Sequence, residues 1–187
     1  MASEHSEQKR RNRLLAALTP EDHSLLAPHL QEFSLELGSV LQVPDKPIEY
    51  VYFPHQGMIS LLAVMLDGQG IETATVGSEG VVGAMSGFGF RRGFTRAVVQ
   101  APLVAGRISC THFQAAVQNS EALKHLIVSY NELLVAQIQQ TAACNALHPT
   151  ESRLARWLLQ TRDRIDSDVL PLTQNSCRKC SGSDGRR

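Results

Sequence analysis

The sequence predicts an α+β fold, in which an antiparallel β-roll of the jelly-roll kind precedes one long helix. Two observations lead to this prediction. Between residues 33 and 109, short runs of alternating apolar and polar residues are separated by glycine-containing turns, a pattern typical of antiparallel strands. Residues 121–147 then continue without a proline or a glycine, and their apolar residues recur at intervals of three and four, which indicates a helix.

Composition limits the class of protein. The chain has 187 residues, of which 43% are hydrophobic and 19% charged, as in ordinary globular proteins of one or two domains. Lysine plus arginine and aspartate plus glutamate number 18 each, so net charge gives no bias toward nucleic acid. No apolar run has the length of a membrane span, the N-terminus lacks a secretory signal, and four scattered cysteines form no disulfide framework. We therefore expect a cytoplasmic protein without a membrane partner.

The first third of the chain changes from helical to extended patterns. Residues 1–11 are polar and are predicted to be disordered. Thr19 followed by Pro20 and two acidic residues predicts a helix start, with the helix continuing toward Leu30. Residues 33–43 then predict a strand that is bulged at Gly38.

The middle third predicts a series of strands joined by turns. Strands are expected at 50–53 and 58–66, separated by a break at 54–57, and then at 71–76, 95–101 and 103–109. Asp67-Gly68-Gln69-Gly70 is a strong hairpin signal. A glycine-rich loop occupies 85–93, and helical spacing resumes at 111–118 before the long helix begins.

The long helix at 121–147 has two possible roles. It is either a core helix of a single domain, or a spine with one side packed on its own domain and the other on a second copy, as in a short parallel coiled coil. Under the second interpretation, apolar and small polar residues of the helix form the dimerisation surface. These residues are Leu123, Leu126, Ile127, Tyr130, Leu133, Leu134, Gln137, Ile138 and Thr141.

The C-terminal region begins with a break at His148 and Pro149 and predicts a further helix. Leu154, Trp157 and Leu158 form its apolar side. Its arginines are solvated residues or, in a complete DNA-binding domain, contacts to DNA phosphates; the candidates are Arg153, Arg156 and Arg162. Residues 175–187 contain no aliphatic residue and are predicted to be a disordered tail.

This order of elements resembles the Crp/Fnr-type family of bacterial transcription regulators over residues 12–174. The segments that carry the resemblance are Val51-Tyr52-Phe53-Pro54, Asp67-Gly68, Ala74-Thr75-Val76-Gly77, Glu79-Gly80-Val81-Val82-Gly83, Cys144-Asn145-Ala146-Leu147-His148, and Glu151 through Leu159.

The resemblance implies a function for each part of the chain. Residues 12–120 would form a cyclic-nucleotide-binding-like sensor domain, 121–147 the helix of a homodimer, and 148–174 the start of a DNA-binding winged-helix domain. The protein would regulate transcription and would not be an enzyme, so no catalytic residues are expected.

The sequence departs from the family at the two cyclic-nucleotide motifs. Family members that bind cyclic nucleotide have a Gly-Glu pair for the ribose and an Arg-Ser pair for the phosphate. Here Ala84 follows Gly83, Thr95 replaces the arginine, and Arg96 replaces the serine. Because successive strand residues face opposite ways, Arg96 is expected to point out of the pocket.

We therefore expect an unknown small-molecule effector and no cyclic-nucleotide cofactor. Two arginines of the glycine-rich loop are either anion ligands or solvated loop residues. The candidate pocket residues are Gly83, Ala84, Arg91, Arg92, Thr95 and Arg96.

A second departure concerns the DNA-reading helix-turn-helix, which has no counterpart after Gln174. A one-base shift in a suitably chosen coding string would turn residues 175–187 into a family-like helix-turn-helix. The hypothesis is that this tail is a frameshifted product of a longer regulator gene. Weak, non-specific DNA binding is expected at most.

Two other classes of function stay open. The chain could be a stand-alone ligand-binding or interaction module that heterodimerises with an intact regulator. A metal-dependent jelly-roll enzyme is disfavoured, because the seven histidines are dispersed and no metal-binding H-x-H pattern occurs. Cys177-x-x-Cys180 is only half of a metal or redox motif, so no metal is expected.

Overall fold

The computed structural model describes residues 12–165. The predictions for residues 1–11, for the end of the winged-helix segment and for the Cys177/Cys180 tail lie outside the described residues. The elements in chain order are α2 (Arg13–Ala16), α3 (Pro20–Ser24), the 3-10 helix η1 (Ala27–His29), β1 (Gln31–Leu35), β2 (Val40–Gln42), β3 (Tyr50–Val64), β4 (Gly70–Val76), the 3-10 helix η2 (Ala84–Phe88), β5 (Arg96–Ser109), α4 (Cys110–Asn119), α5 (Glu121–Leu147) and α6 (Thr150–Ile165).

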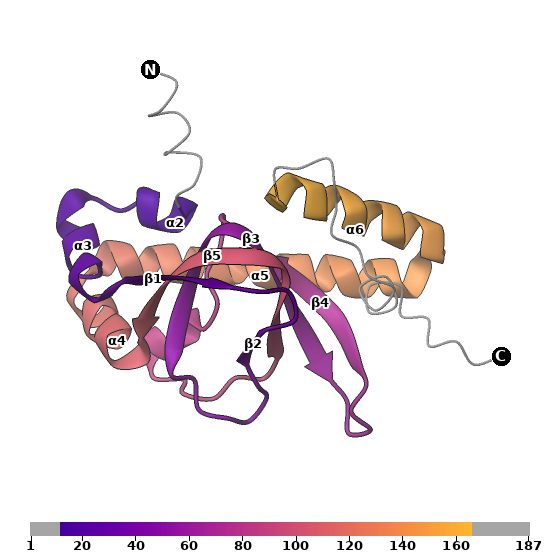
Figure 1. Ribbon diagram of the computed structural model, residues 1–187, viewed down its shortest axis with the longest axis horizontal. Coiled ribbons are helices and arrows are strands. Elements are labelled where there is room, and N and C mark those ends of the chain that lie inside the picture. Colours follow the sequence, from indigo (N-terminus) through magenta and orange to yellow (C-terminus); the bar gives the residue numbers. More distant parts are fainter. Residues whose placement is uncertain (1–11, 166–187) are drawn as a thin grey trace, which may run out of the picture.

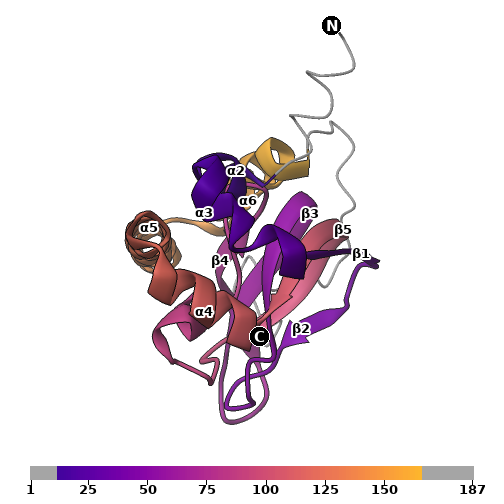
Figure 2. The same ribbon diagram turned by 90° about the vertical axis from the view of Figure 1, so that its left-hand side faces the viewer.

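The strands form one antiparallel sheet in the order β1-β5-β3-β4 (Figure 1). Two short strands share one edge of β5: β1 pairs with its second half, where Phe33 lies opposite Ala105, and β2 pairs with its first half, where Val40 lies opposite Val98. Helices α4 and α5 lie to one side of the strands, as the end-on view of α5 in Figure 2 shows. The predicted α+β fold of an antiparallel roll followed by a long helix is confirmed.

The two central strands are longer than the sequence predicted. The expected break at 54–57 is wrong, because β3 continues through it and Pro54 pairs with Ala105. The expected division between Ala101 and Leu103 is also wrong, because both residues belong to β5. The pairing register slips between Pro54 and Ile59, and such bulges accommodate a residue like Pro102 that cannot donate to the ladder.

The N-terminal region confirms the predicted helix start but shortens the helix. Thr19 Oγ1 accepts a hydrogen bond from the Asp22 N–H at 3.2 Å, yet α3 ends at Ser24 and only η1 follows. Pro28 lies within η1 and lacks the N–H that a continuing α-helix would use. The predicted bulged strand at 33–43 is two strands, and Gly38 lies between them with φ of 88°.

Helix α5 has the bounds that the sequence predicted. Ser120 caps it by accepting from the Leu123 N–H at 2.9 Å, and its own hydroxyl donates to Asp22 Oδ1 at 2.5 Å. Leu123 and Ile127 are buried in a core cluster with Phe53 and other residues of the roll and α4. The first half of α5 is therefore an integral part of the roll's core.

Helix α6 returns from the end of α5 and packs against the roll. Trp157 is buried with Met58 of β3 and Ala101 of β5. Arg164 Nε donates to Glu79 Oε1 at 2.7 Å, in a half-buried ion pair. None of the helices within residues 12–165 combines the length and the apolar character needed to cross a membrane.

Candidate functional site

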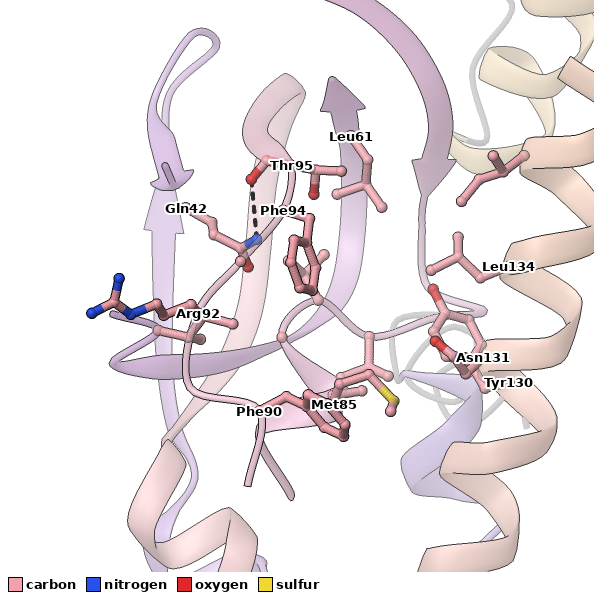
Figure 3. Close-up of a pocket in the computed structure, with 17 residues that line it drawn as sticks. Gln42, Leu61, Met85, Phe90, Arg92, Phe94, Thr95, Tyr130, Asn131 and Leu134 are labelled. Atoms are coloured by element: carbon pink, nitrogen blue, oxygen red, sulfur yellow. Dashed lines mark hydrogen bonds between the residues drawn. The ribbon is translucent and has the colours of Figure 1, made fainter. Parts of the chain in front are cut away.

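A cavity of about 330 Å³ lies between the roll and α5. Figure 3 shows side chains of the roll on one side and Tyr130, Asn131 and Leu134 of α5 on the other. The long helix therefore forms a wall of the cavity, and a molecule filling the cavity would contact that helix directly.

Gly83 and η2 form one wall. Gly83 has φ of 84°, a left-handed conformation that glycine adopts without steric cost. A Cβ at this position would also lie 3.1 Å from the Tyr50 carbonyl oxygen. The turn at Gly83 directs the chain into η2, so that Ala84 and Met85 line the cavity.

Gln42 and the segment before β5 form a second part of the roll's side of the cavity. Gln42 Nε2 donates to the Thr95 carbonyl oxygen at 3.1 Å (Figure 3). Its amide lies where a Cβ on Gly93 would be, so the close approach requires glycine there. This contact holds Thr95 and the preceding Phe94 at the cavity.

Tyr130 connects the cavity wall with the core. Its side chain is buried, and burial raises the pKa of its phenol above the usual range. A Cβ on Gly80 would collide with the Tyr130 hydroxyl. The glycine in the Glu79-Gly80 segment thus allows α5 to pack closely on the roll.

Four of the six candidate effector residues line the cavity: Gly83, Ala84, Arg92 and Thr95. Arg91 does not, since its Nη2 donates to Gln114 Oε1 of α4 at 2.6 Å. Arg96 is exposed at the start of β5 and is not a lining residue, in keeping with strand alternation. The assignment of these residues to an effector stays a prediction.

Several lining residues were not found from the sequence. Leu61 faces the cavity from β3, Phe90 approaches it from the glycine-rich loop, and Phe94 approaches it from the position just after that loop. The signal for the two phenylalanines was available, because large aromatic residues in an otherwise polar loop are unusual unless they have something to cover. Leu61 could not be chosen, because its direction depends on the strand register.

The expected dimerisation surface divides into two groups. Leu123, Ile127 and Tyr130 are buried within the subunit, and Leu134 and Ile138 line the cavity. Leu134 and Ile138 are only half-buried, and the assignment of the nine residues to a dimer surface stays a prediction. The apolar repeat of α5 also continues onto the core side of the helix, which holds Leu123, Ile127 and Tyr130. Leu126, Gln137 and Thr141 are half-buried, whereas Leu133 is 70% exposed.

The side of α5 away from the core carries its own apolar residues. Val128 and Val135 are 44% and 43% exposed, and Ala142 follows after another seven residues and is also exposed. A seven-residue repeat of small apolar side chains suits a two-stranded helical interface. We call these three residues, Val128, Val135 and Ala142, the outer stripe of α5.

Two of the three candidate DNA-contacting arginines face the protein. Arg153 and Arg156 are half-buried in a polar groove between α6, α5 and β4, which Glu72 also lines. Arg156 Nη1 donates to Thr141 Oγ1 of α5 at 3.4 Å. Arg162 is exposed. The role of all three arginines in DNA binding stays a prediction.

Within the described part of the chain, no three histidine, cysteine, aspartate or glutamate residues lie close enough together to hold a metal ion. Cys110 and Cys144 are buried free thiols, and burial raises the pKa of the Cys110 thiol. A high thiol pKa disfavours the thiolate that redox and metal chemistry require.

Comparison with solved structures identifies the fold. The chain is similar to a Crp/Fnr-family regulator from Eubacterium rectale (TM-score 0.74, 11% identity, 91% of this chain and 80% of that one). It is also similar to the c-di-GMP-responsive global regulator CLP of Xanthomonas campestris (0.70, 15%, 88% and 85%). A third similar structure is a Crp/Fnr-family regulator from Thermus thermophilus (0.65, 18%, 82% and 79%).

No protein-family model and no curated protein matches the sequence. At these levels of identity, the likeness establishes a shared fold. The cyclic-nucleotide-binding-like roll and the long helix predicted from the resemblance are those of Crp/Fnr regulators.

Proposed function

We propose that this chain is the effector-sensing and dimerisation part of a Crp/Fnr-type transcription regulator. The observation that carries the proposal is the shared wall. The cavity is bounded by η2 and the strands on one side and by Tyr130, Asn131 and Leu134 of α5 on the other. An effector in the cavity would therefore act on the same helix that carries the outer stripe.

Coupling between the effector and the dimer follows because α5 contacts both the cavity and the second copy. Its inner side contacts the cavity, and its outer stripe pairs with the same stripe of a second copy. A ligand shifts the equilibrium between arrangements of the two helices only if it binds one arrangement more tightly. A ligand in contact with Leu134 and Ile138 has this property, because a small rotation of α5 changes those contacts and the pairing together.

Helix α6 is the element through which such a change would reach DNA. It follows α5 after only two intervening residues, His148 and Pro149, so a movement of the α5 C-terminus carries the α6 N-terminus with it. Within the described residues, the basic residues of α6 would be the part nearest to DNA.

Sedimentation velocity tests the dimer. We expect residues 1–187 to sediment as a dimer, and Val135→Glu to weaken association by at least about tenfold, because a carboxylate would be buried without a partner. Met65→Glu is the matched control, because Met65 is exposed at the β3–β4 hairpin, far along the chain from the stripe. A wild-type monomer at high concentration, or equal effects of both substitutions, would refute the proposal.

A further inference from the structure

We propose that the cavity binds an uncharged, predominantly apolar small molecule. The inference rests on the proposed function, since it names the chemical class of the effector for the same site. The described side chains that line the cavity are mainly aliphatic or aromatic, among them Leu61, Val81, Leu134, Ile138, Phe90 and Phe94. Its volume of about 330 Å³ is within the range of small-molecule sites.

The charges around the cavity disfavour an anionic nucleotide. Among residues 12–165, Arg92 is the only charged residue of the lining. Arg92 is exposed, and Figure 3 shows its guanidinium directed away from the other labelled side chains. A phosphate placed among the other lining side chains would lose its hydration without gaining a cationic partner, which is a large cost.

The two positions that could have supplied polar ligands for a nucleotide are occupied by small side chains. Ala84 is buried and offers a methyl group. Thr95 offers a hydroxyl, which is neutral. At these two positions the cavity therefore lacks the carboxylate that would bind a ribose and the cation that would bind a phosphate.

The rings at the cavity give positive evidence for an apolar ligand. Phe90 is 54% exposed and Phe94 is 83% exposed, although both line the cavity. Exposed aromatic rings beside an apolar hollow are an unfavourable arrangement in water. An apolar ligand would cover both rings, and this burial would contribute to its affinity.

The cavity could also accommodate one polar group on the ligand. The side chains of Asn131 and Thr95 line the cavity and make no hydrogen bond to another residue of the described range 12–165. A single hydroxyl or carbonyl group on the ligand would satisfy one of them. Such a group would fix the orientation of an otherwise apolar molecule.

The probe for the test is N-phenyl-1-naphthylamine, an uncharged fluorophore whose emission rises in apolar surroundings. We expect one probe to bind per chain of residues 1–187. Cyclic AMP in large excess should not displace it. Displacement by cyclic AMP, or binding of cyclic AMP without binding of the probe, would overturn the inference.

Two substitutions test whether the probe binds in the cavity. Leu134→Trp fills the cavity and is expected to weaken probe binding by about tenfold or more. Its neighbour Leu133→Trp is the matched control, because Leu133 is exposed and does not line the cavity; its affinity should be unchanged. Equal losses in both variants would show that the probe binds elsewhere, and would overturn the inference.

A second cavity-filling variant, Ile138→Trp, keeps the test decisive if Leu134→Trp fails to fold, as judged by circular dichroism. The association state is measured on the same samples. A dimer that does not bind the probe would refute the ligand class and leave the proposed function intact. A monomer that binds the probe would refute the proposed function and leave the ligand class intact.

Discussion

Tyr130 is the residue at which the core, the cavity and α5 meet. Its ring belongs to the core cluster of the roll, its hydroxyl lies against Gly80, and it lines the cavity. Burial is the largest cause of its raised phenol pKa. The neutral form is therefore strongly favoured in the folded state, and ionising this phenol must work against folding.

The sign of the pH effect follows from linkage. The folded-state pKa of Tyr130 lies above its unfolded value of about 10, so its contribution to stability is constant below that pH and is lost as pH rises further. We predict that Tyr130→Phe reduces the alkaline loss of unfolding free energy by up to about 1.4 kcal/mol per pH unit. Urea unfolding between pH 8 and pH 11, about the range of phenol titration, measures this.

Tyr50→Phe serves as the control, because Tyr50 is half-buried on β3 and lies outside the cavity lining. The two variants and the wild type are compared over the same pH range. An unchanged profile for Tyr130→Phe would show that this phenol is not the group whose ionisation opposes folding.

At the scale of elements, β3 and β5 depend on one close contact where their register slips. Gly57 has φ of 91°, and a Cβ there would collide with the Pro102 carbonyl oxygen. We predict that Gly57→Ala lowers the unfolding free energy by about 2–4 kcal/mol, from the left-handed backbone and the overpacking together. Chemical denaturation at constant pH measures the loss.

Gly38→Ala separates the cost of the left-handed backbone from the cost of overpacking. Gly38 has a similar φ of 88°, but nothing lies within 4 Å of the position of its Cβ. Only the backbone cost remains, so the loss should be about 1 kcal/mol. Equal losses at the two glycines would mean that the strands can move apart at the bulge without penalty.

The long helix α5 and the hairpin turn at 67–70 were predictable from local residues, whereas the continuity of the strands was not. The bounds of α5 follow from the cap at Ser120 and from the absence of proline and glycine until Pro149. The bulges that carry β3 past Pro54 and β5 past Pro102 depend on pairing between distant segments, which local patterns do not contain.

Only part of the candidate site could be predicted, because local patterns do not show which side chains face the cavity. Gly83, Ala84 and Thr95 were identified through motif positions, and all three line the cavity. Leu134 and Ile138 were assigned to a dimer surface because α5 is apolar over more than one side. Periodicity identifies a helix with a broad apolar surface, but it does not say which part faces the roll, the cavity or a second copy.

At the scale of the whole molecule, the docking of α6 limits what the described chain can offer to DNA. Trp157 is buried against the roll, Arg164 pairs with Glu79, and Arg153 and Arg156 lie in the groove next to α5 and β4. Most of the basic side of α6 is thus occupied by contacts within the protein.

We predict that residues 1–187 bind duplex DNA only weakly, with dissociation constants of about 10⁻⁶ M or higher and without sequence preference, as in non-specific phosphate binding. Fluorescence anisotropy on labelled duplexes at two salt concentrations measures this. Arg162→Gln should weaken the residual binding more than Arg153→Gln does. Tight, sequence-selective binding by this chain would contradict the prediction.

The central claim is that the cavity and the dimer share α5, and linkage between the two sites tests it most directly. The measurement is the dimer dissociation constant by sedimentation equilibrium, with and without saturating N-phenyl-1-naphthylamine. Allosteric coupling of ordinary size predicts a change of about fivefold or more. An identical dissociation constant while the probe occupies one site per chain would contradict the account.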